Sequence, residues 1–196
     1  MQFHQDVTLV ILAGGQGSRL GGLEKAWITW QGESIIQRLI TAFAPLCNEV
    51  VISCNREFAR YQALGYKTCQ DNPTYQYAGP LAGILAAAPL VKTKYLLLLP
   101  CDCPQPPPNL LFKLHAALSK SKATAAYAHD GERDQYLFCL VETMALSTLQ
   151  PYLESGDRSV RGWLAKGDVI PVDFSESGES FRNINTPKDL EIIQGH

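Results

Sequence analysis

The chain is poor in charged residues, and its small excess of negative charge excludes a partner bound by a broad positive field. Only 18% of the 196 residues are charged, with 17 Lys and Arg against 19 Asp and Glu, for a formal net charge of −2. Proteins that bind nucleic acid rely on a positive surface, which this composition does not provide. The sequence therefore predicts no nucleic-acid partner, and any anion site must be a local one.

Long hydrophobic runs are also scarce. The apolar run YLLLLPC, residues 95–101, is far shorter than the about 20 residues that a membrane-spanning helix needs. The first residues, MQFHQDV, lack the cationic start and apolar centre of a signal peptide. We therefore expect no membrane association and a cytoplasmic location.

The six cysteines contain no C-x-x-C pair, which argues against the commonest zinc and redox motifs. Cys101 and Cys103 flank Asp102 and would point to one face of a strand, so a zinc site or a disulfide stays an alternative. Buried free thiols are commoner in apolar, strand-like surroundings and fit a reducing compartment. The four histidines are scattered and no serine lies in a nucleophile elbow, so a hydrolytic triad is poorly supported.

Hydrophobic residues make up 46% of the chain, enough for a packed core, and their pattern alternates between strand and helix. Predicted strands cover 7–13, 49–54, 66–71 and 94–102. Predicted helices cover 35–46, 56–65, 80–91 and 107–118, with Ser34 as the first cap and Gly65 as a stop. This alternation predicts an α/β, Rossmann-like fold, with a predominantly parallel sheet and helices on both faces.

The regular alternation of predicted strands and helices ends after residue 120. Residues 123–141 predict two strands around a turn at Asp130-Gly131, followed by helices at 143–154 and 158–166. A strand at 169–174, a polar loop at 175–180 and a last helix from Thr186-Pro187 complete the pattern. We interpret residues 1–196 as one domain, with a nucleotide-binding half, 1–120, and an acceptor-binding half, 121–196, that share one sheet.

The most informative stretch is LAGGQGSRLGGLEK, residues 12–25, which leaves the first strand with five glycines among nine residues. Ligands bind at the carboxyl ends of parallel strands, and glycines let backbone N–H groups converge on phosphate oxygens. Arg19 and Lys25 add charge there. The Rossmann and P-loop fingerprints both fail, at Leu20 and at Leu23-Glu24 respectively. A flexible turn is the alternative.

This loop resembles the L-A-G-G-x-x-x-R-M-G-x-x-K signature of nucleotidyltransferases that make nucleoside-diphosphate-linked products, with Leu20 in place of Met. Further stretches, in order from residue 9 to residue 190, resemble the molybdenum cofactor guanylyltransferases. They are NR at 55–56, GPLAGIL at 79–85, LPCDCP at 99–104, HDGERDQ at 129–135 and NINTPKDL at 183–190. The implied fold is the three-layer sandwich of the nucleotide-diphospho-sugar transferases.

The resemblance implies transfer of GMP from GTP to molybdenum-loaded molybdopterin, which gives the guanine dinucleotide cofactor and pyrophosphate. It implies Mg²⁺, or alternatively Mn²⁺, as the cofactor. It also implies transient contacts with the molybdenum insertion protein and with target apo-enzymes. The choice of guanine rests on the resemblance alone.

Asp102, Lys25 and Arg19 are the predicted catalytic residues. Asp102 follows the most apolar strand, where a carboxylate would bind Mg²⁺ and the metal would bridge phosphate oxygens. Lys25 and Arg19 are assigned to the phosphates. The structural alternatives are a turn at Asp102 before Pro104, and a solvated pair of cations on a loop.

The remaining candidate residues belong to the nucleotide or to the pterin. Those assigned to the nucleotide are Leu12, Ala13, Gly14 and Gly15 through their backbones, Asp71, Gly79, Gly83, and Asn55. Asn55 is a candidate because Ser53 stands where the family often has Asn, and both would point to the same face of a strand. Asp71 is alternatively a turn residue, and Gly83 alternatively permits tight helix packing.

The resemblance implies that Arg158, Asn183 and Asn185 match positions that line the active site or the pterin side in the family. Asn side chains match the amide-like donors and acceptors of a pterin, although NINTP also reads as the cap of the last helix. The segment from His129 to Asp134 is either a solvated hairpin turn or a contact to acceptor or partner. Three functional alternatives stay open: cytidylyl transfer to the same pterin, transfer to a sugar phosphate, and a non-catalytic nucleotide or cofactor carrier.

Overall fold

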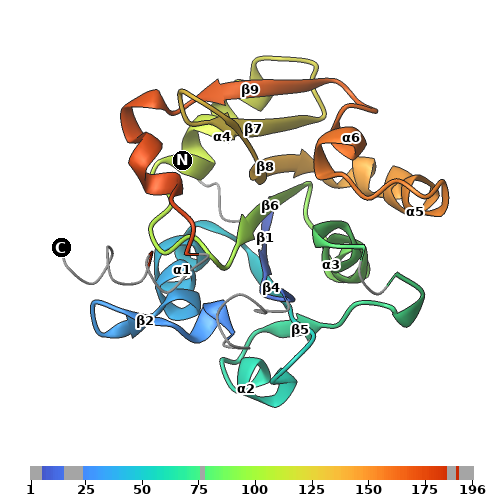
Figure 1. The fold of residues 1–196 in the computed structure, drawn as a ribbon. Helices are drawn as coiled ribbons and strands as arrows, with labels where there is room; N and C mark the ends of the chain where they lie inside the picture. The colour runs from blue at the N-terminus through green and yellow to red at the C-terminus, as the bar shows by residue number, and fades with distance from the viewer. Residues whose placement is uncertain (1–5, 16–23, 76–77, 185–188, 190–196) are drawn as a thin grey trace.

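The computed structural model describes residues 6–15, 24–75, 78–184 and 189 (Figure 1). Its centre is a seven-stranded sheet with the strand order β5-β4-β1-β6-β8-β7-β9. The strands are β1 Val7–Leu12, β4 Glu49–Ser53, β5 Lys67–Cys69, β6 Tyr95–Pro100, β7 Ala125–His129, β8 Asp134–Glu142 and β9 Val169–Asp173. Strands from residues 1–120 and from residues 121–196 therefore belong to the same sheet.

The sheet is parallel in its first half and mixed in its second. β1 pairs in parallel with β4 and β6, and β4 pairs in parallel with β5. β8 is antiparallel to both β6 and β7, and β9 is parallel to β7. The antiparallel pair β7–β8 follows from the short turn at Asp130-Gly131, since a parallel connection needs a long crossover. The predicted α/β fold with a predominantly parallel sheet is confirmed.

Helices cover both faces of the sheet, which is why nearly all residues of β1 and β6 are buried and most of them are apolar. The helices are α1 Ile35–Phe43, α2 Phe58–Gln62, α3 Pro80–Ala87, α4 Leu110–Ser119, α5 Leu149–Glu154 and α6 Val160–Leu164. Figure 1 shows α1 and α4 on one face of the sheet, α3, α5 and α6 on the other, and α2 beside the edge strand β5. Successive side chains of β1 point to opposite faces of the sheet, so Leu9 and Ile11 pack in one hydrophobic core and Val10 packs in the other.

Two predicted helices end earlier as α-helices than their apolar patterns do. The last turns of the predicted helices at 35–46 and 80–91 are 3-10 helices, η3 Ala44–Leu46 and η5 Ala88–Leu90. Each carries a proline in its first turn, at Pro45 and Pro89. Proline lacks the N–H that would continue the α-helical ladder, so the chain tightens there.

Several local expectations were wrong. The strand predicted at 66–71 is only Lys67–Cys69, and the helix predicted at 143–154 begins as the 3-10 helix η6, Thr143–Thr148. The polar loop predicted at 175–180 is a pair of 3-10 turns, η7 Ser175–Phe181. The side chain of Asp173 starts them by accepting a bond from the N–H of Ser175 at 2.8 Å. The last helix, predicted from Thr186, lies outside the described residues.

The sequence analysis missed a small hairpin, β2 Thr29–Trp30 and β3 Glu33–Ser34. Gln31 and Gly32 form its turn with φ of 50° and 83°, the left-handed pair that two-residue hairpins favour. Ser34 stands at the N-cap of α1, as predicted. Its hydroxyl, however, donates to Oε1 of Gln37 at 2.6 Å and makes no capping bond with the backbone.

Of the residues that the structure describes, no helix has the length and apolar character to cross a membrane. The longest α-helices, α1 and α4, have nine and ten residues.

Gly178 in η7 tests how the second half is packed. A Cβ there would lie 2.6 Å from the carbonyl oxygen of Asp130 at the tip of the β7–β8 hairpin. Because that oxygen belongs to the backbone, Gly178→Ala is expected to lower the free energy of unfolding by about 1–3 kcal/mol. Urea unfolding measures the loss, with Ser177→Ala as a neighbouring control that stays within about 0.5 kcal/mol. Equal stability of the two variants would contradict this packing.

Candidate active site

The carboxyl ends of the four parallel strands form one row at the same edge of the sheet. The final residues pair across the sheet, Leu12 with both Ser53 and Pro100, and Ser53 with Cys69. Two residues beyond each strand stands a candidate site residue. They are Gly14 after β1, Asn55 after β4, Asp71 after β5 and Asp102 after β6. The parallel register therefore brings together four residues that are up to 88 positions apart in the chain.

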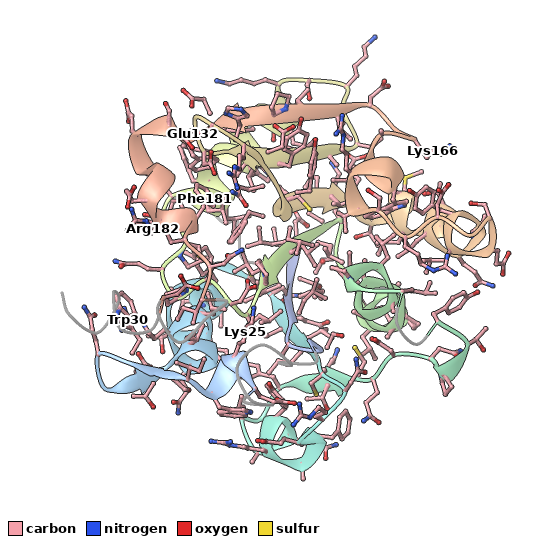
Figure 2. All side chains as sticks on the ribbon, in the orientation of Figure 1. Lys25, Trp30, Glu132, Lys166, Phe181 and Arg182 are labelled. Atoms are coloured by element: carbon pink, nitrogen blue, oxygen red, sulfur yellow. The ribbon has the colours of Figure 1, made fainter. Side chains whose placement is uncertain are left out.

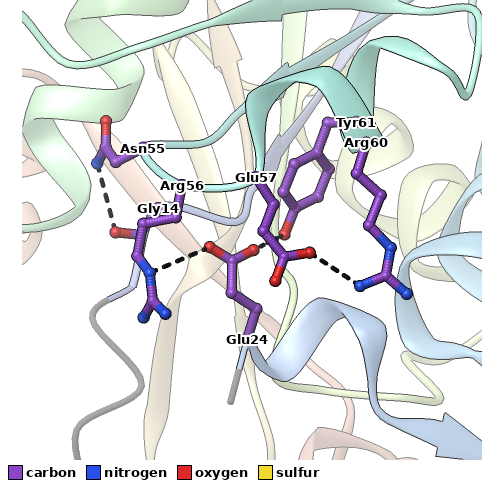
Figure 3. A network of polar contacts seen from close by, with 7 residues as sticks. All are labelled: Gly14, Glu24, Asn55, Arg56, Glu57, Arg60 and Tyr61. Atoms are coloured by element: carbon purple, nitrogen blue, oxygen red, sulfur yellow. Dashed lines mark hydrogen bonds and ion pairs between the residues drawn. The ribbon is translucent and has the colours of Figure 1, made fainter. Parts of the chain in front are cut away.

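Asn55 ties three of these strand ends together. Its Nδ2 donates to the carbonyl oxygen of Gly14 at 3.3 Å (Figure 3). The same Nδ2 donates to Oδ2 of Asp71 at 2.8 Å. Its Oδ1 accepts from the N–H of Asp71 at 3.0 Å. β4 ends at Ser53, so Asn55 lies in the following loop and does not share a strand face with Ser53. The prediction of a shared face was wrong.

Burial raises the pKa of Asp71, and the hydrogen bond from Asn55 opposes that rise. Among the described residues, Oδ1 of Asp71 is buried and has no hydrogen-bond partner. A partly buried carboxylate oxygen with nothing to accept from is a natural acceptor for a donor group of a ligand.

Lys25 and Asp102 are 77 positions apart in the chain and meet across the site. Nζ of Lys25, in the 3-10 helix η2 Lys25–Trp27, lies 3.2 Å from Oδ2 of Asp102. The side chains are 23% and 22% exposed, so the pair borders solvent without being buried. Figure 2 shows Lys25 beside the chain that leaves β6. Two of the three predicted catalytic residues are thus in contact, and Arg19 lies outside the described residues.

The second carboxylate oxygen of Asp102, Oδ1, does not take part in the contact with Lys25. Within the part of the chain that the structure describes, its Oδ1 is buried and has no hydrogen-bond partner. The carbonyl oxygen of Asp102 accepts from the N–H of Ile184 at 2.7 Å, which holds the NINTP segment against the same turn. Asn183, predicted on the pterin side, is exposed and lies beside that bond. Asn185 falls outside the described residues.

The backbone that follows β1 is partly engaged already. The N–H of Ala13 donates to the carbonyl oxygen of Ser53 at 2.7 Å, and the carbonyl oxygen of Leu12 accepts from Cys101 at 3.0 Å. These bonds prolong the sheet, so those two groups hold the strand ends together. Among the described residues, no hydrogen bond engages the N–H groups of Gly14 and Gly15. They are the backbone donors of this segment that can meet an anion.

Gly79 and Gly83 have different surroundings. Gly79, the N-cap of α3, has φ of 66° and ψ of −148°, and among the described residues a Cβ there would meet no atom within 4 Å. Only glycine adopts this backbone easily, and no described side chain fills the space beside it. A Cβ on Gly83 would lie 2.5 Å from Oγ of Ser53 and 3.0 Å from Cδ2 of Leu12. Gly83 therefore lets α3 pack closely on the sheet, the structural alternative stated above.

Arg158 and the hairpin tip are used structurally. Nη1 of Arg158 donates to the carbonyl oxygens of Leu153 at 2.6 Å and of Asp157 at 2.7 Å. At the hairpin, Oδ1 of Asp130 accepts from the N–H groups of Glu132 and Arg133. These hydrogen-bond partners lie within five residues of Arg158 or Asp130 in the chain. A role of Arg158 toward the pterin stays a prediction.

The cysteines are free thiols, five of them buried, as the sequence predicted for such apolar positions. Burial raises the pKa of Cys101 and of Cys103 to about 12, with the Asp102 carboxylate adding to both shifts. A thiol nucleophile needs a lowered pKa, so these cysteines suit packing and not covalent chemistry. Among the residues described, no group of three His, Cys, Asp or Glu side chains could hold a metal.

One part of the site escaped sequence reasoning. Glu24, next to Lys25, is buried with an exposed fraction of 6% and contacts Tyr61 and Arg56 (Figure 3). The sequence did contain a signal for Glu24, because it lies between the glycine-rich loop and Lys25, in a stretch that predicts ligand binding. What was missing was the partner, because Tyr61 lies 37 positions away.

The family model for the MobA-like NTP transferase domain matches residues 9–170. Curated relatives support it over nearly the full length. The molybdenum cofactor guanylyltransferase of Shewanella sediminis is 36% identical over 187 residues, 95% of each chain. That of Mannheimia succiniciproducens is 39% identical over 184 residues, 94% of this chain and 96% of that one. This chain belongs to the MobA-like NTP transferase family.

Solved structures show the same fold in other MobA-like and related proteins. Molybdopterin-guanine dinucleotide biosynthesis protein A of Archaeoglobus fulgidus has a TM-score of 0.78 at 23% identity, covering 96% of this chain and 97% of that chain. A CMP:2-keto-3-deoxy-manno-octonic acid synthetase solved with CTP has a TM-score of 0.73 at 14% identity, covering 97% of both chains. The predicted three-layer transferase fold is confirmed by these likenesses.

The thiols that flank Asp102 give a first test of this MobA-like site. With a pKa of about 12, on the order of one thiol in 10⁴ is ionised at pH 8. We expect iodoacetamide to leave Cys101 and Cys103 of the folded protein unmodified while it alkylates both in denaturant. Peptide mass spectrometry measures the two rates. Rapid modification of either thiol in the folded protein would contradict their burial.

Proposed function

We propose that this chain transfers GMP from GTP to molybdenum-loaded molybdopterin and releases pyrophosphate. The observation that carries the proposal is the contact between Lys25 and Asp102 at the row of strand ends, in a chain whose relatives are named molybdenum cofactor guanylyltransferases. A cation and a carboxylate held 3.2 Å apart suit a triphosphate and its counterion. The N–H groups of Gly14 and Gly15, at the same edge of the sheet, make no hydrogen bond among the described residues. The family name of the relatives selects GTP and the pterin.

The residues present fit a magnesium ion that arrives with its nucleotide. The unpartnered Oδ1 of Asp102 is a hard oxygen ligand at the edge of the site. Mg²⁺ keeps several waters and needs only one or two carboxylates when phosphates complete its shell, so a cage of three acidic residues is not required. Asp102 would hold the metal, which neutralises phosphate charge when bound.

The protein's own groups then position two anions. Lys25, with Arg19, would hold the β- and γ-phosphates, and the N–H groups of Gly14 and Gly15 would receive phosphate oxygens. An oxygen of the acceptor's phosphate attacks the α-phosphorus, the bond to the bridging oxygen of the β-phosphate breaks, and pyrophosphate leaves with those electrons. No nucleophile of the protein takes part, which agrees with the raised pKa of the nearby thiols. The acceleration of the reaction comes from the orientation of the two substrates and from compensation of their negative charge.

The two halves of the sheet would divide the substrates. Asp71 and the open backbone at Gly79 would meet the guanosine, with Asn55 holding Asp71 in place. Asn183, near Asp102 through the Ile184 bond, together with Asn185 and Arg158 would face the pterin. We expect the reaction in the cytoplasm, where free thiols persist, and transient contacts that pass the cofactor from the insertion protein to apo-enzymes.

Asp102→Asn tests the metal assignment. We expect kcat/KM for pyrophosphate release from GTP, Mg²⁺ and molybdopterin to fall by about a hundredfold or more, because a neutral amide binds the metal more weakly and forms no ion pair with Lys25. The matched control is Glu49→Gln, which breaks a similar Lys–carboxylate pair, Lys67–Glu49 at 2.9 Å, at the other end of β4. Its kcat/KM should stay at the wild-type value. Unchanged turnover in the Asp102 variant would remove the metal role.

Nucleotide choice separates the proposal from its closest rivals. Titration calorimetry with GTP, CTP and ATP in the presence of Mg²⁺ should give the tightest binding for GTP. Tightest binding of CTP would favour cytidylyl transfer. Tight binding of GTP without pyrophosphate release on adding molybdopterin would favour a carrier.

A further inference from the structure

Glu24 is a buried carboxylate for which the proposed reaction has no use. It is 6% exposed and, among the described residues, it is the one acidic side chain in the buried class. Its Oε2 accepts from the hydroxyl of Tyr61 at 2.7 Å, and its Oε1 lies 3.8 Å from Nε of Arg56 (Figure 3). Burying a carboxylate costs free energy even when it is paired, and an apolar residue often replaces such a pair without loss. The stability of the fold therefore gives no clear reason for a glutamate here.

The position of Glu24 in the chain suggests a different reason. It is the first described residue after the glycine-rich loop and the N-cap of η2, and its carbonyl oxygen accepts from the N–H of Trp27 at 3.0 Å. Lys25 is the next residue. Whatever fixes Glu24 therefore fixes the backbone from which the Lys25 side chain reaches Asp102.

Residues of helix α2 contact this turn on both sides of Lys25, at Glu24 and at Trp27. Tyr61 holds Glu24 through its hydroxyl, and its ring packs on Trp27 with 4.9 Å between ring centroids. The guanidinium of Arg60 lies 3.9 Å from the centroid of the same Trp27 ring. Burial, the bond to Glu24 and nearby carboxylate and thiol charges raise the pKa of Tyr61, so it stays a hydrogen-bond donor at every physiological pH.

A residue with an unfavourable backbone conformation follows Arg56 at the start of α2. Glu57, between Arg56 and the helix, has φ of 46°, a left-handed conformation that is unfavourable for a residue with a side chain. An ion pair between Glu57 and Arg60, 2.8 Å long, accompanies it. Backbone strain kept next to a ligand site is typical of residues that hold functional geometry.

We propose that Glu24, Tyr61 and Arg56 are positioning residues for Lys25. Tyr61 and Arg56 fix the Glu24 carboxylate, and Glu24 fixes the turn so that the Lys25 ammonium lies between Asp102 and the phosphates. This inference rests on the proposed function for the role of Lys25, and the geometry itself carries the link from α2 to Lys25.

Tyr61→Phe is the direct test, since it removes one hydroxyl and keeps the ring against Trp27. We expect it to weaken GTP binding about tenfold in the wild-type background and to change nothing in the Lys25→Ala background, because its effect passes through Lys25. Calorimetry measures both affinities. The matched control, Thr8→Val, breaks another buried side-chain bond, Thr8 to Thr93 at 2.8 Å, and should leave GTP binding unchanged. Equal weakening by Tyr61→Phe in both backgrounds, or no weakening at all, would overturn the proposal.

Hydrogen exchange without nucleotide tests the same link independently of GTP. Amide exchange in residues 24–28 should speed up in Tyr61→Phe and stay at the wild-type rate in Thr8→Val. If the wild type binds no GTP, the proposed function fails, while unchanged exchange in Tyr61→Phe overturns the present inference. Glu24→Leu, which removes the acceptor of the Tyr61 bond and the charge that faces Arg56 at a similar side-chain size, serves as a second variant in both measurements and is expected to behave as Tyr61→Phe does.

Discussion

The parallel register of β5, β4, β1 and β6 is the constraint from which the site follows. Because Leu12, Ser53, Cys69 and Pro100 end in one row, Gly14, Asn55, Asp71 and Asp102 emerge at one edge of the sheet. Backbone bonds continue the row one residue further, from Ala13 to Ser53 and from Cys101 to Leu12. A slip of one residue in any strand would turn its end residue to the opposite face of the sheet. The chemistry is thus set by backbone pairing as much as by side chains.

On this scaffold the side chains divide between holding the site and leaving atoms for ligands. The side-chain amide of Asn55 donates hydrogen bonds to Gly14 and Asp71, and Lys25 forms an ion pair with Asp102. One oxygen of Asp71 and one of Asp102 have no hydrogen-bond partner among the described residues, and both are buried. Unpartnered buried oxygens are costly in a finished protein, so their presence at the same edge supports the proposal that a ligand and a metal complete the site.

The α/β architecture could be predicted from the sequence, because a parallel sheet buried on both faces leaves nearly continuous apolar runs such as those of β1 and β6. The sequence also placed Asp71 and Asp102 at strand ends, since that position follows from strand boundaries alone, and it placed Lys25 after the glycine-rich loop. It failed where the outcome depends on tertiary partners. The 3-10 turns of η7 depend on Asp173 and on burial of Phe181 against Phe138, whose ring centroids are 5.0 Å apart. Likewise, the roles of Gly83 and Glu24 depend on Ser53 and Tyr61, which no local pattern connects to them.

The central claim is that the row of strand ends binds a triphosphate between Lys25 and Asp102. A crystal structure with a non-hydrolysable GTP analogue and Mn²⁺ tests it most directly, since the anomalous signal of manganese locates the metal independently of the model. The account predicts one manganese within direct coordination distance of Oδ1 of Asp102, with the phosphates on Lys25. Manganese and phosphates bound elsewhere on the protein would contradict it.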